Sequence, residues 1–261
     1  MAWMTVPRIK EKHKLKPMFS VGFLMRSLPQ GLKLPGSAIV IYANSIEELF
    51  ASKLDLERMK DLEEAIVNYN TLSIYKSRKY DLIVIRLAIG APLTAMIAED
   101  IIRLGVKRLL IIGEAGGINQ ALSPGNIVLC TKAMRDTGTS EHYLGKGKYV
   151  NTDKWLTKSM KKALGKEGIE FVSGATWSID APYTETREEV DNYSKAGIMT
   201  VEMESAGLFA VAMKRGVQAS AVFIVSDVLR LDSGWSGFDS GEAYAKGFAK
   251  LPKIAEIFAS L

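Results

Sequence analysis

Two glutamates two residues apart, Glu202 and Glu204, have the types and spacing that point most directly to chemistry. They lie between two apolar stretches, residues 197–199 and 208–211. Side chains at positions i and i+2 share a face on an extended segment but not on a helix. An ionised carboxylate only accepts hydrogen bonds, so the pair needs donors, such as the hydroxyl groups of a sugar. A structural ion pair with a nearby arginine, or a single exposed helix cap, is the alternative.

The elements around the two glutamates place them at a junction. Residues 200–203 are predicted to be extended and residues 205–215 to form a helix, whose N-terminus favours negative charge. Upstream, continuous apolar runs at 38–42, 82–85 and 108–112 are typical of strands covered on both faces. Further strands are predicted at 126–130, 174–180 and 219–225, and helices at 47–68, 94–104, 154–164 and 243–261, the last kinked at Pro252.

The alternation of strands, helices and short glycine turns implies parallel pairing with right-handed crossovers. We therefore predict an α/β protein with a single domain of three layers, α/β/α, around a central mixed, mostly parallel, twisted sheet. Residues 36–261 form this domain in the prediction. Residues 1–35 show no sustained periodicity and are predicted to be an N-terminal arm along the surface or a neighbouring subunit.

Composition excludes several functional classes. The 261 residues are 48% hydrophobic and 24% charged, which is typical of a soluble globular protein. Cys130 is the single cysteine, which excludes an internal disulfide. The chain has two histidines, one of them His13, and with one cysteine these are too few for a convincing metal site. The net charge of +5 comes without interleaved aromatics or a known nucleic-acid-binding module. No apolar run reaches the roughly 18 residues of a spanning helix. We expect a cytoplasmic protein with no metal and no nucleic-acid or membrane partner.

Four motifs resemble one known family. Residues 201–206, Val-Glu-Met-Glu-Ser-Ala, resemble the ribose-binding signature of the nucleoside phosphorylase/nucleosidase superfamily, which includes uridine and purine nucleoside phosphorylases. Residues 89–92, 113–117 and 223–227 resemble two glycine-containing turns and a strand that ends in Ser-Asp, in the family's order. The resemblance implies a phosphorylase/hydrolase-like fold and a nucleoside substrate. It also implies a homo-oligomer, a dimer or trimer of dimers, and no cofactor other than phosphate as a possible co-substrate.

The resemblance also suggests which residues bind the nucleoside. Met203 and Glu204, with Glu202, would hold the ribose, and His13 would reach the ribose of a neighbouring subunit unless it is merely solvated. For the base, the candidates are Trp177 and Tyr183, which could stack on it or pack in the core, and Arg187, which matches the uracil-reading arginine of uridine phosphorylases. The glutamine that accompanies this arginine is absent, and Glu185 or Thr186 stands in its place.

Asp227, at the end of a predicted buried strand, is the candidate acid that protonates the leaving base. A carboxylic acid can do this near neutral pH only if burial or another carboxylate raises its pKa. Purine-cleaving members of the family use such an aspartate, whereas uridine phosphorylases lack it. The polar segment 135–143 resembles a loop of uridine phosphorylases, so the identity of the base stays open.

The nucleophile is open as well. Family phosphorylases bind phosphate through arginines and a threonine, but Ile111 and Glu114 occupy two of those positions here. Phosphorolysis remains the family default, with phosphate held at Gly113 by Arg86 or Arg135. The alternative is a hydrolytic nucleosidase in which Glu47 or Glu114 activates water, because residues 115–117 resemble the Ala-Gly-Gly turn of hydrolytic members. A nucleoside-binding protein without catalysis is a third possibility, which the predicted buried acid Asp227 disfavours.

Overall fold

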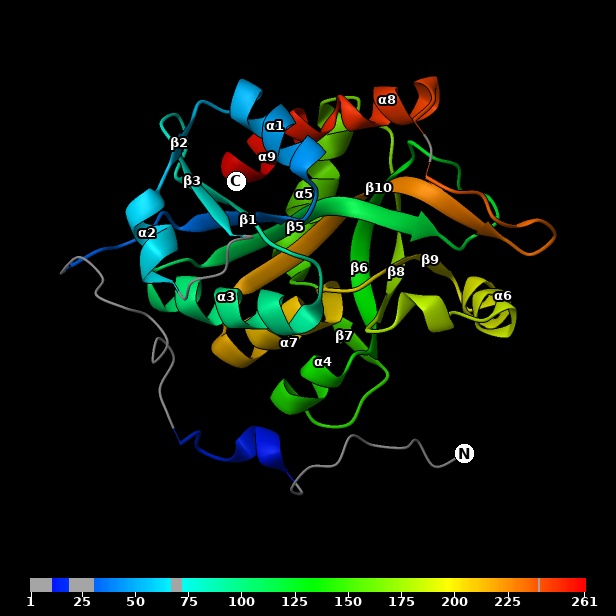
Figure 1. Ribbon diagram of the computed structural model, residues 1–261, viewed down its shortest axis with the longest axis horizontal. Helices are drawn as coiled ribbons and strands as arrows, with labels where there is room; N and C mark the ends of the chain where they lie inside the picture. Colours follow the sequence, from blue (N-terminus) through cyan, green and yellow to red (C-terminus); the bar gives the residue numbers. More distant parts are fainter. Residues whose placement is uncertain (1–10, 19–30, 67–71, 239) are drawn as a thin grey trace.

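The computed structural model describes residues 11–18, 31–66, 72–238 and 240–261, and one twisted sheet runs through them (Figure 1). The order of its strands is β11-β10-β6-β8-β9-β5-β1-β4-β3-β2, with β7 on β6. The strands are β1 (Ser37–Ile41), β2 (Leu56–Arg58), β3 (Ser73–Ser77), β4 (Leu82–Arg86), β5 (Arg108–Gly117), β6 (Ile127–Asp136), β7 (Tyr149–Asn151), β8 (Val172–Ile179), β9 (Ile198–Glu202), β10 (Gln218–Arg230) and β11 (Gly234–Trp235).

Helices cover both faces of this sheet (Figure 1). Buried residues of α3 and α7 pack on one face and those of α1, α5 and α9 on the other. The helices are α1 (Asn44–Lys53), α2 (Lys60–Ala65), α3 (Ala91–Arg103), α4 (Gly138–Tyr143), α5 (Lys154–Lys166), α6 (Arg187–Lys195), α7 (Ser205–Arg215), α8 (Glu242–Phe248) and α9 (Leu251–Ala259), with 3-10 turns η1 (Lys12–Lys14) and η2 (Pro182–Thr184). Among the described residues, no helix is long and apolar enough to cross a membrane.

The long pairings in the sheet are parallel. Strand β5 runs parallel to β1 and β10, and β6 runs parallel to β8. Antiparallel pairs are shorter and include β5 with β9 and β6 with β10. Because β10 pairs with both β5 and β6, the strands β10, β6, β8, β9 and β5 close into a ring. The predicted three-layer α/β/α class with a mixed, mostly parallel sheet is confirmed.

The structure corrects three sequence-based assignments. The helix predicted over 47–68 is divided, because Asp55 adopts a left-handed conformation (φ 49°) after α1 and the next residues form β2 against β3. The glycine turn predicted at 113–117 is instead the second half of β5, which pairs with β10 throughout. The C-terminal helix is split into α8 and α9, and Pro252 lies in the first turn of α9, where its missing N–H costs nothing.

Candidate functional site

The junction between β9 and α7 is held together by the carboxylate of Glu202. Its Oε2 accepts hydrogen bonds from the backbone N–H groups of Glu204 (3.0 Å) and Ser205 (2.8 Å), and the Ser178 hydroxyl donates to its Oε1. The residue is only 8% exposed, and burial raises its pKa. Glu202 therefore satisfies orphan N–H groups at the start of α7. The role of Glu202 in binding the ribose stays a prediction, and in this structure its carboxylate accepts hydrogen bonds from the chain itself.

Glu204 occupies the N-cap position of α7 without capping it. Its Oε1 accepts a 2.6 Å hydrogen bond from the N–H of Gly90 and its Oε2 a 3.3 Å one from the N–H of Met203. The residue is 6% exposed, and burial together with the charge of Glu202 raises its pKa to about 8. Each carboxylate oxygen has room for further donors beyond one backbone N–H. Of the two glutamates, Glu204 thus has the larger unused acceptor capacity, with two donors against three for Glu202 among the described residues.

Residues that the sequence analysis did not single out flank Glu204. The Tyr42 hydroxyl, after β1, lies 3.0 Å from Oγ1 of Thr94 on α3, and burial and then the charge of Glu204 raise the pKa of Tyr42. Gly90 has φ 119°, a conformation that favours glycine, so its N–H can reach the Glu204 carboxylate. In the sequence, the glycine of the 89–92 motif was a usable signal for this contact. The sequence offered no comparable signal for Tyr42 and Thr94, which are 52 residues apart.

Asp227 lies on β10, just past a register shift that follows Val225. It is 7% exposed, and both carboxylate oxygens accept hydrogen bonds. The Ser226 hydroxyl donates to Oδ1 at 2.6 Å and the Trp235 indole N–H to Oδ2 at 2.7 Å. Trp235 belongs to β11, which pairs antiparallel with the end of β10. The bulged strand therefore presents an anchored carboxylate at the end of the sheet.

Gly116 of β5 connects the two carboxylates. Val201 of β9 and Asp227 of β10 both pair with it, one on each side of β5. A Cβ at position 116 would lie 3.1 Å from Val201 Cγ1 and 3.4 Å from Asp227 Oδ2, so the glycine leaves space beside the carboxylate. Glu204 follows Val201 by three residues. We call the group the strand-end site, which comprises Gly90, Gly116, Met203, Glu204 and Asp227.

The base-binding candidates differ in burial. Trp177 is fully buried, its ring packs edge-on against Tyr193 at 4.9 Å, and its indole N–H bonds Asp136. Stacking of Trp177 on a base is therefore wrong in this structure, because both ring faces are inside the core. Tyr183 on η2 and Arg187 at the start of α6 are exposed.

Glu185, between η2 and α6, is half-buried, and the charge of Asp227 acts on it. Burial, then the negative charges of Asp227 and Glu189, raise the pKa of Glu185 to about 7. In the sequence, Glu185 stands out only as a residue in the place of the family's glutamine. The effect of Asp227, 42 positions later, comes from the tertiary fold.

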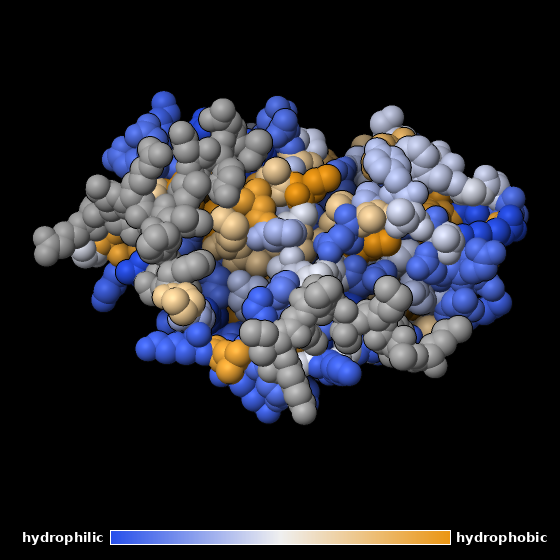
Figure 2. All heavy atoms as spheres, turned by 60° about the horizontal axis from the view of Figure 1, so that its bottom comes forward, coloured by the Kyte–Doolittle hydropathy of each residue, from blue (hydrophilic) through white to orange (hydrophobic). Residues whose placement is uncertain are grey.

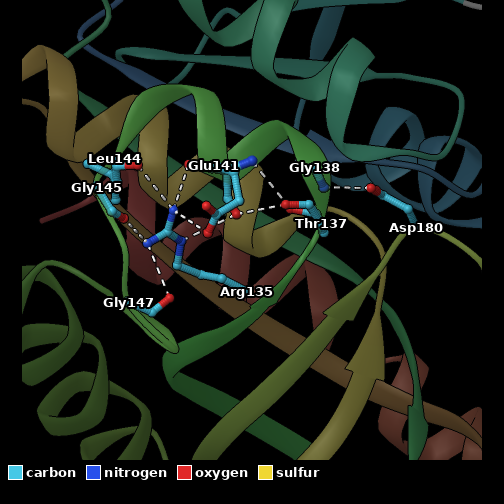
Figure 3. A network of polar contacts seen from close by, with 9 residues as sticks. Arg135, Thr137, Gly138, Glu141, Leu144, Gly145, Gly147 and Asp180 are labelled. Atoms are coloured by element: carbon cyan, nitrogen blue, oxygen red, sulfur yellow. Dashed lines mark hydrogen bonds and ion pairs between the residues drawn. The ribbon is translucent and has the colours of Figure 1, made fainter. Parts of the chain in front are cut away.

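Arg135 holds its own loop together, with its guanidinium among the residues of the segment from Glu141 to Gly147 (Figure 3). Its side chain is 2% exposed and donates to the carbonyls of Ser140 (2.9 Å) and Gly145 (2.7 Å), with an ion pair to Glu141 at 3.1 Å. Its Nε also donates to the Ser140 hydroxyl at 3.3 Å. The prediction that Arg135 binds phosphate is wrong, because its guanidinium donors are committed to the loop.

Arg86 and Glu47 pair with each other. The Nε of Arg86 contacts the Glu47 carboxylate, while the Tyr75 hydroxyl donates to Glu47 Oε1 at 2.6 Å and Arg86 donates to Ser73 Oγ at 3.1 Å. Burial alone would raise the pKa of Glu47, but the Tyr75 bond and the Arg86 charge outweigh it and lower that pKa. This arrangement therefore supports neither Arg86 as a phosphate ligand nor Glu47 as a base that activates water.

Gly113 and Glu114, neighbours on β5, point to opposite faces of the sheet. A Cβ on Gly113 would lie 3.7 Å from the Tyr42 ring, beside the strand-end site. Glu114 is exposed and accepts a hydrogen bond from the hydroxyl of Tyr244 on α8. Its carboxylate therefore lies on the α8 side, away from α7, which begins next to Glu204.

His13 lies in η1, against the loop that Arg135 organises. Its imidazole Cε1 is 3.2 Å from where a Cβ on Gly145 would be, and its carbonyl accepts a bond from Lys214 of α7. Within this chain, His13 contacts α4's loop and α7 and no residue of the strand-end site. Its reach to the ribose of a neighbouring subunit stays a prediction.

Comparison with known proteins gives consistent matches. The model of a family described as the phosphorylase superfamily matches residues 47–258. A guanosine phosphorylase of Halorubrum lacusprofundi is 31% identical over 145 residues, which are 56% of this chain and 60% of that protein. A DeoD-type purine nucleoside phosphorylase of Caldanaerobacter subterraneus subsp. tengcongensis is 30% identical over 204 residues, 77% of this chain and 84% of that protein.

The fold has solved counterparts. A crystal structure of purine nucleoside phosphorylase from Toxoplasma gondii in complex with immucillin-H superposes with a TM-score of 0.77 at 21% identity. The superposition covers 94% of this chain and 98% of that one. At this level of identity the likeness concerns the fold.

Proposed function

The chain belongs to the phosphorylase superfamily, and from this membership we propose that it cleaves the N-glycosidic bond of a ribonucleoside. The observation that carries the proposal is the state of Glu204. Its buried carboxyl group accepts only one backbone N–H at each oxygen and is flanked by the half-buried Met203. The 2′- and 3′-hydroxyls of a ribose are donors of the right kind and spacing for such a group.

The pKa of Glu204 fits this role. Burial and then the charge of Glu202 hold the pKa of Glu204 at about 8. Hydroxyl donors stabilise the charged form, so ribose binding would lower this pKa and ionise the group. A sugar that satisfies Glu204 therefore removes the cost of burying its charge.

Cleavage of the bond develops positive charge on the ribose and negative charge on the leaving base. In the proposed reaction, Glu204 and Met203 fix the sugar, and an acid from the Asp227 end of the strand-end site protonates the base. Positioning and electrostatic stabilisation of this kind can supply several kcal/mol each to lowering the barrier. A purine is the proposed base, supported by the buried Asp227 and by the names of the similar phosphorylases.

Phosphate is the proposed nucleophile, which makes the enzyme a pentosyltransferase of nucleoside salvage without a further cofactor. The names of the relatives support phosphorolysis. Hydrolysis is the second candidate, and a specific observation favours it. Arg86 and Arg135, the arginines expected to bind phosphate, are engaged with Glu47 and with the 140–147 loop.

We further propose that the enzyme is a homo-oligomer, a dimer or a trimer of dimers. Apolar patches lie between polar ones on the side of the molecule that carries α3, α4 and α7 (Figure 2). Ile89, beside Gly90, and Met213, on α7, are more than half exposed. Burial of such side chains against a second subunit would be favourable, by about 25 cal/mol per Å² of apolar surface.

A panel of purine and pyrimidine nucleosides, incubated with and without phosphate, tests the proposal. Chromatography of the free base and of the sugar product identifies the base and the nucleophile in one experiment. Release of base with ribose 1-phosphate supports phosphorolysis, and release with free ribose supports hydrolysis. Stable binding of nucleosides without any release of base would contradict the proposed activity and favour a binding protein.

A further inference from the structure

A groove of about 410 Å³ lies along α5, and none of the residues that line it belongs to the strand-end site. Lys154, Lys158 and Lys161 of α5 line it. Strands β6, β7 and β8 contribute further lining residues, among them Leu129, Thr131, Asn151 and Ser173. The volume is within the range of pockets that hold small molecules, roughly 300–1,000 Å³.

The three lysines of the groove share one side of α5. They stand at positions i, i+4 and i+7, a spacing that places side chains on the same helix face. All three are exposed, and within the described part of the chain none of their ammonium groups makes an ion pair or a hydrogen bond. Like charges four residues apart destabilise a helix. An anion bound in the groove would relieve this repulsion.

Acidic groups do not offset this positive charge. Among the described residues that line the groove there is no aspartate or glutamate, and α5 itself contains five lysines and no acidic residue. Asp153, just before α5, is engaged elsewhere. Its Oδ1 accepts hydrogen bonds from the N–H of Leu156 at 2.7 Å and from the amide of Gln218 at 3.1 Å. The groove therefore favours an anionic ligand.

The strands add neutral hydrogen-bonding groups to the groove. The side chains of Thr131, Asn151 and Ser173 are exposed there, and they make no hydrogen bond to other described residues. A hydroxyl or an amide N–H can donate to a phosphate oxygen, and lysine binds phosphate as a point charge. Cations and neutral donors around one groove are the groups that a phosphate ester or anhydride needs.

The spacing of the lysines favours an extended anion. Lys154 and Lys161 are seven residues apart, which is about 10 Å along a helix axis. A single phosphate would leave part of this charge unpaired, whereas a row of phosphates would lie along it. We propose that the groove is a second binding site, for a small molecule with a linear chain of phosphates, either a nucleoside triphosphate or inorganic tripolyphosphate. This site is distinct from the strand-end site and does not require its nucleoside chemistry.

The first test compares ligands. Calorimetric titration of the unaltered protein, at low salt and without divalent cations, measures the Kd of tripolyphosphate, GTP and orthophosphate. Tripolyphosphate and GTP should bind at least about tenfold tighter than orthophosphate, because several exposed charge pairs contribute together. Tighter binding of GTP than of tripolyphosphate would identify a nucleotide as the ligand, and equal affinities would identify the phosphate chain alone.

The second test uses variants. Lys158→Gln should weaken tripolyphosphate binding about threefold, and its combination with Lys154→Gln and Lys161→Gln at least about tenfold. Lys162→Gln, at an exposed lysine of α5 outside the groove, is the matched control and should keep the affinity within about 1.5-fold. Glu204→Gln should leave tripolyphosphate binding unchanged. Far-UV circular dichroism checks that each variant is folded.

Several results would overturn the proposal. If tripolyphosphate bound no tighter than orthophosphate, or if Lys162→Gln weakened binding as much as Lys158→Gln, only a general attraction to a basic helix would remain. Loss of binding in Glu204→Gln would place the anion in the strand-end site. A single-stranded oligonucleotide that bound far tighter than GTP through the same lysines would make the groove a nucleic-acid surface. Absence of nucleoside cleavage would contradict only the proposed function, so the two proposals fail separately.

Discussion

The carboxylate of Glu202 accepts a 3.0 Å hydrogen bond from the backbone N–H of Glu204, so the first glutamate of the pair holds the second in place. The carboxylate of Glu202 also accepts hydrogen bonds from the backbone at the start of α7 and from Ser178 of β8. Glu204 keeps acceptor capacity at a position beside Gly90. The sequence alone does not distinguish the two carboxylates, but they have different roles: Glu202 positions the backbone, and Glu204 faces the proposed ribose.

The first prediction concerns the sugar. Glu204→Gln should keep the fold but lose about tenfold to a hundredfold in activity, because hydrogen bonds to a charged group are worth roughly 1.5–3 kcal/mol. Glu48→Gln, an exposed glutamate of α1, should behave like the unaltered enzyme. Initial rates with the best nucleoside of the panel check this. Wild-type turnover by Glu204→Gln would remove Glu204 from the site.

A second prediction follows from the raised pKa of Glu204, about 8 against an ordinary value of 4.5 for a glutamate. Between these two values the folded protein holds a proton that the unfolded chain has released. Folding stability attributable to this group is therefore fully present below the lower value and falls as the pH rises toward the upper one. In Glu204→Gln this fall should disappear. Urea unfolding at pH 5 and pH 8 measures it, and an identical pH dependence in both proteins would refute the assignment.

Part of this picture was accessible from the sequence. The helix at 205–215 and the strand before it were predictable, because a polar junction separates two apolar runs with different periodicity. The central strands were predictable for the same reason: they are continuous apolar runs. The order of motifs located the strand ends where Glu204 and Asp227 lie.

The rest depends on contacts between distant residues. Glu202 becomes a cap because Ser178, 24 residues upstream, pairs beside it on β8. Glycines 116 and 117 suggested a turn, yet the pairing of β5 with β9 and β10 makes them strand residues. No local pattern reveals that the guanidinium of Arg135 donates hydrogen bonds to backbone carbonyls up to twelve residues away. Charge and spacing alone could not separate these structural roles from chemical ones.

A third prediction separates structure from phosphate binding at Arg135. Arg135→Lys should lower stability by about 2 kcal/mol, because one ammonium group cannot replace a planar fork that bonds Ser140, Gly145 and Glu141. The KM for phosphate should not change. Arg103→Lys, at an exposed arginine of α3, is the control and should leave both unchanged. A large rise in the KM for phosphate with normal stability would reverse the conclusion.

A fourth prediction concerns the nucleophile. If phosphate attacks, replacing the anionic Glu114 by threonine should leave the KM for phosphate within about twofold, because Tyr244 holds the carboxylate on the α8 side, away from Glu204. Saturation curves with phosphate for both proteins give the result. A KM lowered about tenfold, equivalent to roughly 1.4 kcal/mol, would instead show that the negative charge of Glu114 lies near the dianion and weakens its binding.

The most direct test of the central claim is a cycle that combines Glu204→Gln with removal of the 2′-hydroxyl from the substrate. The ratio of kcat/KM for a ribonucleoside to that for its 2′-deoxy analogue is measured in both proteins. If Glu204 accepts the hydrogen bond of that hydroxyl, the ratio should be about ten in the unaltered enzyme and near one in Glu204→Gln. Equal ratios in the two proteins would contradict the account, because the hydroxyl and the carboxylate would then act independently.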